Sequence, residues 1–141
     1  MHVHINHSDC LLLVQGRALF ALHDLRRGSP TEGRVSSVEA DGERPRVLVI
    51  PPGVAHGFYF HTPSVHVYAV TEYWNHDDEL GCYYADPELE MAWPCKHPIL
   101  SERDRRAPRL SEILDRIPPW QPASQKYPNR ESGAGYSGFS K

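Results

Sequence analysis

Short stretches of alternating apolar and polar residues, separated by glycine and proline, fill the first half of the chain. This alternation is typical of β-strands that bury one face, and the frequent Gly and Pro residues keep the strands short. Many short strands in sequence favour an antiparallel sandwich or barrel. We expect strands at residues 10–14, 18–22, 34–39, 46–50, 57–60 and 65–74, with a tight turn at Gln15-Gly16 between the first two.

The last third of the chain has a different pattern. Residues 101–107 are rich in arginine and are expected to form a loop, whereas 110–117 has the apolar spacing of one short helix before Pro118-Pro119. From residue 121 onward Ser, Gly, Pro, Asn and Lys predominate. We therefore expect one all-β barrel domain over residues 1–120 with one short C-terminal helix. The remaining segment, 121–141, is expected to be a flexible or docked tail.

Composition argues against several classes of partner. The formal net charge is −3, and the basic clusters at 26–27 and 103–106 are too short for a nucleic-acid face. No apolar run approaches the length that spans a bilayer. The three cysteines are odd in number and have no CxxC spacing, which favours a reducing compartment. We expect a cytoplasmic protein with a small-molecule partner and neither a nucleic-acid nor a membrane partner.

Histidines stand out, with nine in 141 residues, and four carry a pattern. His2-Val3-His4 is followed by Asp9 and Gly16, and a second segment spells Pro51-Pro52-Gly53-x-x-His56. The two segments resemble the halves of the cupin signature, with aspartate where glutamate is usual. Three imidazoles and one carboxylate suit Zn²⁺, Fe²⁺, Mn²⁺ or Ni²⁺ better than Mg²⁺ or Ca²⁺. His2, His4, Asp9 and His56 are thus a candidate metal site, whereas His7 is expected to face solvent.

A longer resemblance runs from Asp24 to Pro119. The motifs that carry it are DLRRGSPT at 24–31, IPPGVAHGF at 50–58, TEYWN at 71–75, DELG at 78–81, DPEL at 86–89, WP at 93–94 and PILSERD at 98–104. In this order they resemble the dTDP-4-dehydrorhamnose 3,5-epimerase family. That family implies a jelly-roll cupin barrel, usually dimeric. It also implies cofactor-free epimerisation of a nucleotide-linked keto-sugar by proton abstraction next to the carbonyl.

The resemblance also implies roles for individual residues. The base corresponds to His2, the carboxylate that orients it to Asp104, and the acid to Tyr68. A histidine with a pKa near 6.5 is a suitable base at neutral pH, and a neighbouring carboxylate fixes its tautomer. Contacts to the substrate correspond to His56, Glu79 and Arg103, the last replacing a lysine.

Two departures from the family keep other functions open. The chain begins immediately before His2, whereas the family carries an upstream segment that binds the nucleotide and often crosses to the dimer partner. Asp9 stands at the position of the family's lysine that faces the enolate. A lysine there attracts the enolate, whereas an aspartate repels it. At about 4 Å and an effective dielectric near 20, each unit charge changes the electrostatic energy of the enolate by roughly 4 kcal/mol.

A divalent ion held by Asp9 would remove this conflict. If His2 is one of its ligands, Tyr68 or a metal-bound hydroxide must move the proton. The alternatives are therefore a metal-dependent cupin, either an oxygenase or a metal-assisted isomerase, and a non-catalytic sugar-binding barrel.

Overall fold

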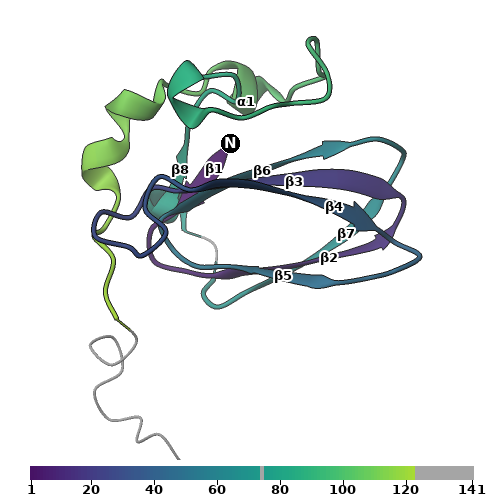
Figure 1. The fold of residues 1–141 in the computed structure, drawn as a ribbon, viewed down its shortest axis with the longest axis horizontal. Coiled ribbons are helices and arrows are strands. Elements are labelled where there is room, and N and C mark those ends of the chain that lie inside the picture. Colours follow the sequence, from purple (N-terminus) through teal and green to yellow (C-terminus); the bar gives the residue numbers. More distant parts are fainter. Residues whose placement is uncertain (74, 123–141) are drawn as a thin grey trace, which may run out of the picture.

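Two antiparallel β-sheets face each other in the computed structural model, which describes residues 1–73 and 75–122 (Figure 1). The first sheet has the strand order β4-β3-β6-β1-β8 and the second has the order β5-β2-β7. The prediction of an all-β fold is confirmed. The strands are β1 (His2–His4), β2 (Asp9–Gln15), β3 (Arg17–Asp24), β4 (Val35–Asp41), β5 (Val47–Ile50), β6 (Val54–Phe60), β7 (Val65–Val70) and β8 (Glu79–Gly81).

The six predicted strands are present, with ends shifted by a few residues. Two further strands, β1 and β8, were not predicted. Both are three residues long, too short to show an alternating pattern. They pair with each other at one end of the larger sheet, and β1 also pairs with β6. Residue 74, the predicted end of the last strand, lies outside the described residues, as does 123–141 of the predicted tail.

Gly16 forms the predicted tight turn, but the turn joins the two sheets. β2 pairs with β5 and β7, whereas β3 pairs with β4 and β6, so both edges of each strand are already occupied. Gly16 has a φ of +86°, and a Cβ atom there would stand 2.3 Å from the Ser64 hydroxyl and 2.5 Å from the Pro63 carbonyl oxygen. Only glycine fits this conformation and this close approach.

The interior between the sheets holds one of two hydrophobic clusters. Leu11, Leu13, Ala18, Phe20, Ile50 and Val54 are buried there. They come from β2, β3, β5 and β6, and they are the inward residues of the alternating patterns. This cluster holds the two sheets together.

A second cluster covers the outer face of the larger sheet. It joins Met1, Val3 and Ala55 to buried residues of the C-terminal part, among them Leu89, Leu110 and Ile117. In Figure 1 this part, drawn in green, lies above β6 and β1. The C-terminal segment is therefore an integral part of the domain up to at least residue 117.

The helical prediction for the C-terminal part was misplaced. Residues 110–117 form two 3₁₀ turns, η3 (Leu110–Glu112) and η4 (Leu114–Arg116), and the α-helical turn α1 (Glu102–Arg105) lies where a loop was expected. A 3₁₀ turn also brings residues three apart to one face, which is how Leu110 and Ile113 reach the core. Two further 3₁₀ turns have the same length: η1 (His76–Asp78) directly precedes β8, and η2 (Pro87–Leu89) follows it. Among the residues that the structure describes, no helix is long and apolar enough to cross a membrane.

The corner at Gly16 gives a test of the fold. Gly16→Ala should lower the free energy of unfolding by about 2–4 kcal/mol, because it adds a steric clash to the cost of a positive φ. Gly28→Ala is the matched control, since Gly28 has a φ of +80° but a Cβ atom added there would meet nothing within 4 Å. It should cost only about 1–2 kcal/mol. Urea denaturation measures both, and equal losses would contradict the clash at the corner.

Candidate active site

β1 brings two histidines to the interior of the barrel. His2 is in register with His56 on β6 and with Gly81 on β8, and His4 is in register with Glu79. Val3, between them, is completely buried in the outer cluster. Because side chains alternate across a strand, His2 and His4 share the inner face with His56.

His2 pairs with Asp104 from α1. The distance between His2 Nε2 and Asp104 Oδ1 is 3.3 Å. Ser101 caps α1: its hydroxyl donates to Asp104 Oδ2 at 2.5 Å and accepts from the Asp104 backbone N–H at 3.1 Å. The cap thus fixes the carboxylate that faces His2 and leaves His2 Nδ1 available to accept a proton.

The charges around this pair set its protonation. Burial lowers the pKa of His2, and the Arg103 guanidinium lowers it further, against the opposing effect of Asp104. The pKa of Asp104 is also lowered, because its hydrogen bond with Ser101 and the positive charges nearby outweigh the effect of burial. At neutral pH the pair is therefore a neutral imidazole beside a carboxylate.

Arg103 and Glu79 pair with each other next to His2. Arg103 Nη1 donates to Glu79 Oε2 at 2.5 Å, which ties α1 to β8. Both residues were expected to contact the substrate. The structure brings them to the same end of the barrel as His2 and Asp104.

Tyr68 lies on the inner face of β7, an edge strand of the opposite sheet, and is 49% exposed there. It is in register with Leu11, which is buried in the interior cluster, so the two side chains share the inner face. Its ring lies 6.1 Å from that of Phe58 on β6. Burial raises the pKa of Tyr68, and the carboxylates of Asp9 and Glu79 raise it further, so the phenol keeps its proton at neutral pH.

Asp9 lies on the inner face of β2 at the centre of a histidine cluster. Its Oδ2 is 3.4 Å from His4 Nε2 and 3.2 Å from His56 Nε2. Burial raises the pKa of Asp9 and lowers that of His4. Burial also lowers the pKa of His56 to about 3, so this ring is neutral at all ordinary pH values.

His7 does not face solvent as expected: it is buried, with 5% of its surface exposed. Its Nδ1 lies 2.5 Å from Asp78 Oδ2, and its Nε2 lies 3.5 Å from Asp9 Oδ1. The expectation assumed that the alternation of His2 and His4 continues to His7, but the strand ends at His4 and the chain bends at Ile5 and Asn6. Asp78 holds this bend, because both backbone N–H groups donate to its Oδ1 at 2.7 Å.

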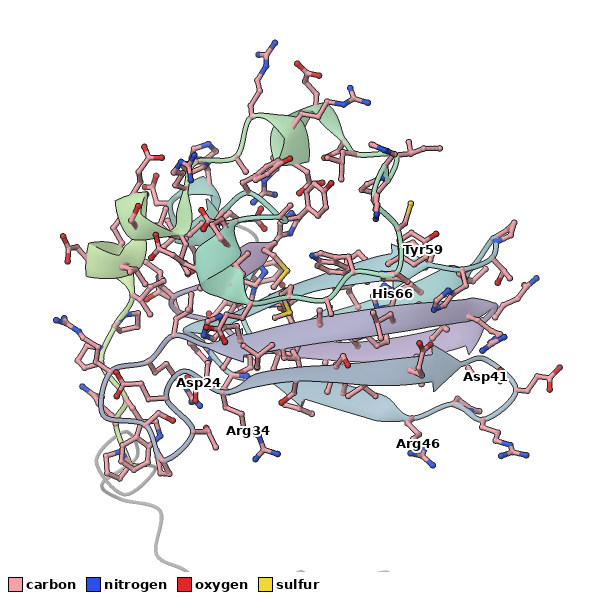
Figure 2. All side chains as sticks on the ribbon, turned by 45° about the horizontal axis from the view of Figure 1, so that its top comes forward. Asp24, Arg34, Asp41, Arg46, Tyr59 and His66 are labelled. Carbon is pink, nitrogen blue, oxygen red and sulfur yellow. The ribbon has the colours of Figure 1, made fainter. Side chains whose placement is uncertain are left out.

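A cleft of about 530 Å³ opens beside the His2–Asp104 pair. His2, His56 and Asp104 line it, together with Phe58 and Tyr59 of β6 and the segment from Trp93 to Leu100. Figure 2 shows Tyr59 on the side of β6 that faces this segment. Tyr68, Glu79 and Arg103 do not line the cleft.

The predicted site residues therefore form two groups. His2 pairs with Asp104 at the cleft, with Arg103 and Glu79 beside them. The ligand atoms that converge are those of His4, Asp9 and His56, and His2 is not among them. The motif predicted that His2 would join the other three residues, but its Nε2 faces Asp104 instead.

Fold and site together describe a cupin-type barrel with a histidine–aspartate pair at a cleft. The sequence profile of the dTDP-4-dehydrorhamnose 3,5-epimerase family matches residues 1–112, and the chain belongs to this family. The predicted family and the jelly-roll cupin fold are thereby confirmed.

Individual relatives agree with this assignment. The dTDP-4-dehydrorhamnose 3,5-epimerase of Pseudomonas aeruginosa is 37% identical over 91 residues, covering 63% of this chain and 50% of the relative. The Mycobacterium tuberculosis H37Rv enzyme of the same name is 32% identical over 114 residues, covering 77% of this chain and 56% of the relative. The chain thus spans about half the length of these curated relatives.

Solved structures of the family superimpose closely. The Mycobacterium tuberculosis epimerase has a TM-score of 0.79 at 29% identity, covering 85% of this chain and 64% of that one. The dTDP-6-deoxy-D-glucose-3,5-epimerase of Legionella pneumophila, in complex with dTDP-4-keto-L-rhamnose, has a TM-score of 0.77 at 31% identity. It covers 86% of this chain and 67% of that one.

Asp78 gives a test of the site's framework. Asp78→Asn should lower the free energy of unfolding by about 3 kcal/mol. It removes the buried negative charge that faces His7, and it replaces the charged acceptor of the Ile5 and Asn6 backbone N–H groups by a neutral one. The pKa of Asp78 is lowered in the folded state, mainly by these hydrogen bonds against the effect of burial. Its stabilisation is therefore complete above the unfolded pKa of about 4 and is lost as pH falls below it.

The measurement is denaturant unfolding of both proteins at pH 7 and at pH 3. The difference between them should shrink at the lower pH. Asp77→Asn is the control, since this neighbouring side chain is 93% exposed. A loss of similar size for both variants would contradict the role given to Asp78.

Proposed function

We propose that this chain epimerises a keto-sugar, linked to a nucleotide, by removing and returning a proton at a carbon next to the carbonyl. The observation that carries the proposal is the pairing of His2 with Asp104 at the wall of the cleft, in a chain of the epimerase family. The reaction needs a base, an acid on the other face of the sugar, and a site large enough for the substrate.

His2 is the proposed base. Its lowered pKa leaves the imidazole neutral at physiological pH, which is the form that accepts a proton. Asp104 engages Nε2, so Nδ1 is the atom that would take the proton from the sugar. Asp104 also stabilises the imidazolium that forms, because its carboxylate stays ionised.

Tyr68 is the proposed acid. It stands on β7, in the sheet opposite the one that carries His2, so a sugar bound between the sheets would meet the two groups on different faces. Its raised pKa keeps the phenol protonated, as an acid requires. Protonation from the face opposite to the abstraction inverts the carbon.

The cleft supports binding of the rest of the substrate. Tyr84 and Trp93 line it with aromatic surface, and their rings lie 6.3 Å apart. His56 lines the same cleft, whereas Arg103 and Glu79 lie beside it and would contact the phosphates or the sugar through charge. The Legionella relative was crystallised with a dTDP-linked keto-sugar, which supports this class of substrate.

We also propose a homodimer formed through the outer face of the smaller sheet. Register places Val49, Cys10 and Ala69 in one row on that face and Val47, Leu12 and Val67 in the next. Val47 and Val49 are 59% and 64% exposed. A contiguous apolar face of this kind is typical of an interaction surface.

The three free cysteines support a reducing, cytoplasmic location.

The activity is tested by proton exchange. With dTDP-4-dehydro-6-deoxyglucose in D₂O, the protein should introduce deuterium next to the carbonyl, measured by NMR. Tyr68→Phe should reduce inversion by about 10²-fold or more, because it removes the acid. Tyr73→Phe is the control, since this tyrosine is 98% exposed and does not line the cleft. Binding of the nucleotide-sugar without any exchange would instead favour the sugar-binding barrel.

The base predicts a particular pH dependence. Activity should be full above the pKa of His2, which is lowered from 6.5, and should fall as pH drops through it. Asp104→Asn should lower kcat/KM by about 10²–10⁴-fold. It should also move the acidic limb to lower pH, since the Asp104 charge raises the pKa of His2. A limb that does not move in this variant would contradict the pairing.

If the chain forms this dimer, light scattering at micromolar concentration should give the mass of two chains. Val49→Lys should shift the mass toward one chain, because it places a charge in the centre of the apolar face. Arg46→Glu is the control: Figure 2 shows Arg46 pointing away from the sheets. A mass of one chain for the unmodified protein would contradict this proposal.

A further inference from the structure

Two imidazoles and one carboxylate converge inside the barrel. One ligand atom from each of His4, Asp9 and His56 lies within 4.8 Å of the others. Asp9 Oδ2 is 3.4 Å from His4 Nε2 and 3.2 Å from His56 Nε2. Two atoms bound to a tetrahedral ion at about 2.1 Å each stand roughly 3.4 Å apart. Both separations from Asp9 Oδ2 match this distance.

The carboxylate at the centre of this cluster lacks a hydrogen-bond partner. Asp9 is 2% exposed, yet its Oδ2 accepts no hydrogen bond from the described residues. Leaving a buried carboxylate oxygen without a partner costs several kcal/mol. A cation among the three side chains would satisfy it.

The tautomer of His56 points to the same conclusion. Its Nδ1 donates to the Val54 carbonyl oxygen at 3.1 Å, which leaves a lone pair on Nε2. This nitrogen lies 3.2 Å from Asp9 Oδ2. Two acceptors this close repel each other unless a proton or a metal cation lies between them. Donation of one ring N–H to a backbone carbonyl is also how metal-binding histidines are usually held.

The other oxygen of Asp9 is held by a separate chain of groups. Oδ1 lies 3.5 Å from His7 Nε2, and His7 Nδ1 is held by Asp78. His7 and Asp78 therefore act as positioning residues that orient the carboxylate and leave Oδ2 directed at His4 and His56.

We propose that His4, Asp9 and His56 bind one divalent transition-metal ion. Nitrogen and carboxylate ligands of this kind suit Zn²⁺, Fe²⁺, Mn²⁺ or Ni²⁺. This site differs from the four-residue site expected from the sequence, because His2 Nε2 faces Asp104. Neither His2 nor Asp104 is among the ligands, so zinc binding and proton exchange are measured separately and either can fail without the other.

The test is a zinc titration of the full chain after removal of metals with a chelator, in competition with a chromophoric chelator. One Zn²⁺ should bind per chain. Asp9→Asn and His56→Ala should each weaken binding by more than about 100-fold, beyond the 10- to 100-fold typical of residues that only orient ligands. His2→Asn should change the affinity by less than about 10-fold.

His23→Asn is the matched control. His23 is buried on β3 and also has an unpartnered Nδ1, but it is in register with Ala55 on the outer face of the sheet. It should bind zinc as the unmodified chain does. Substitution with Co²⁺ gives a second readout: visible absorption bands of a low-symmetry site should appear and should be lost in Asp9→Asn.

Melting curves of the metal-free variants show whether each one folds. If Asp9→Asn does not fold, His56→Gln replaces it, and the zinc-dependent rise in melting temperature is compared instead. Unchanged zinc affinity in both cluster variants would overturn the proposal. Loss of zinc in His2→Asn alone would also overturn it, as would binding no tighter than that of exposed histidines.

Discussion

The buried carboxylate of Asp9 is the constraint around which this end of the barrel is organised. A carboxylate that is 2% exposed must be neutralised or paired, and the chain surrounds it with three imidazoles from β1, β6 and the bend after β1. Each of these elements is in turn fixed from outside. β1 is held between β6 and β8, and the bend is held by Asp78. The short strand β1 therefore matters more to the site than its three residues suggest.

The two histidines of β1 take part in two kinds of chemistry. His2 and His4 lie on one face of β1, yet His2 turns to Asp104 and His4 to Asp9. We assign His2 and Asp104 to proton transfer, and His4 and Asp9 to metal binding. A divalent ion beside Asp9 leaves a net charge of +1, so a position that would repel an enolate becomes one that attracts it. This would reconcile the family's reaction with an aspartate at this position.

Some of this was predictable from the sequence because strand periodicity is local. The spacing His2-Val3-His4 puts both histidines on one face, the Pro-Pro-Gly segment positions His56, and alternation turns Tyr68 inward. The tight turn at Gly16 was also predicted, but its passage between sheets depends on pairings made by distant strands. The helical turns at 110–117 are set by packing on the outer face of the sheet, which periodicity alone does not specify.

The burial of His7 was not predictable in the same way, since it depends on Asp78, 71 residues away in the chain. The measurement that tests the account most directly is anomalous diffraction at the zinc edge from crystals of the zinc-loaded chain. We predict one strong peak bounded by His4, Asp9 and His56, with His2 paired to Asp104. A peak coordinated by His2, or no peak in this cluster at stoichiometric zinc, would contradict the separation of the two centres.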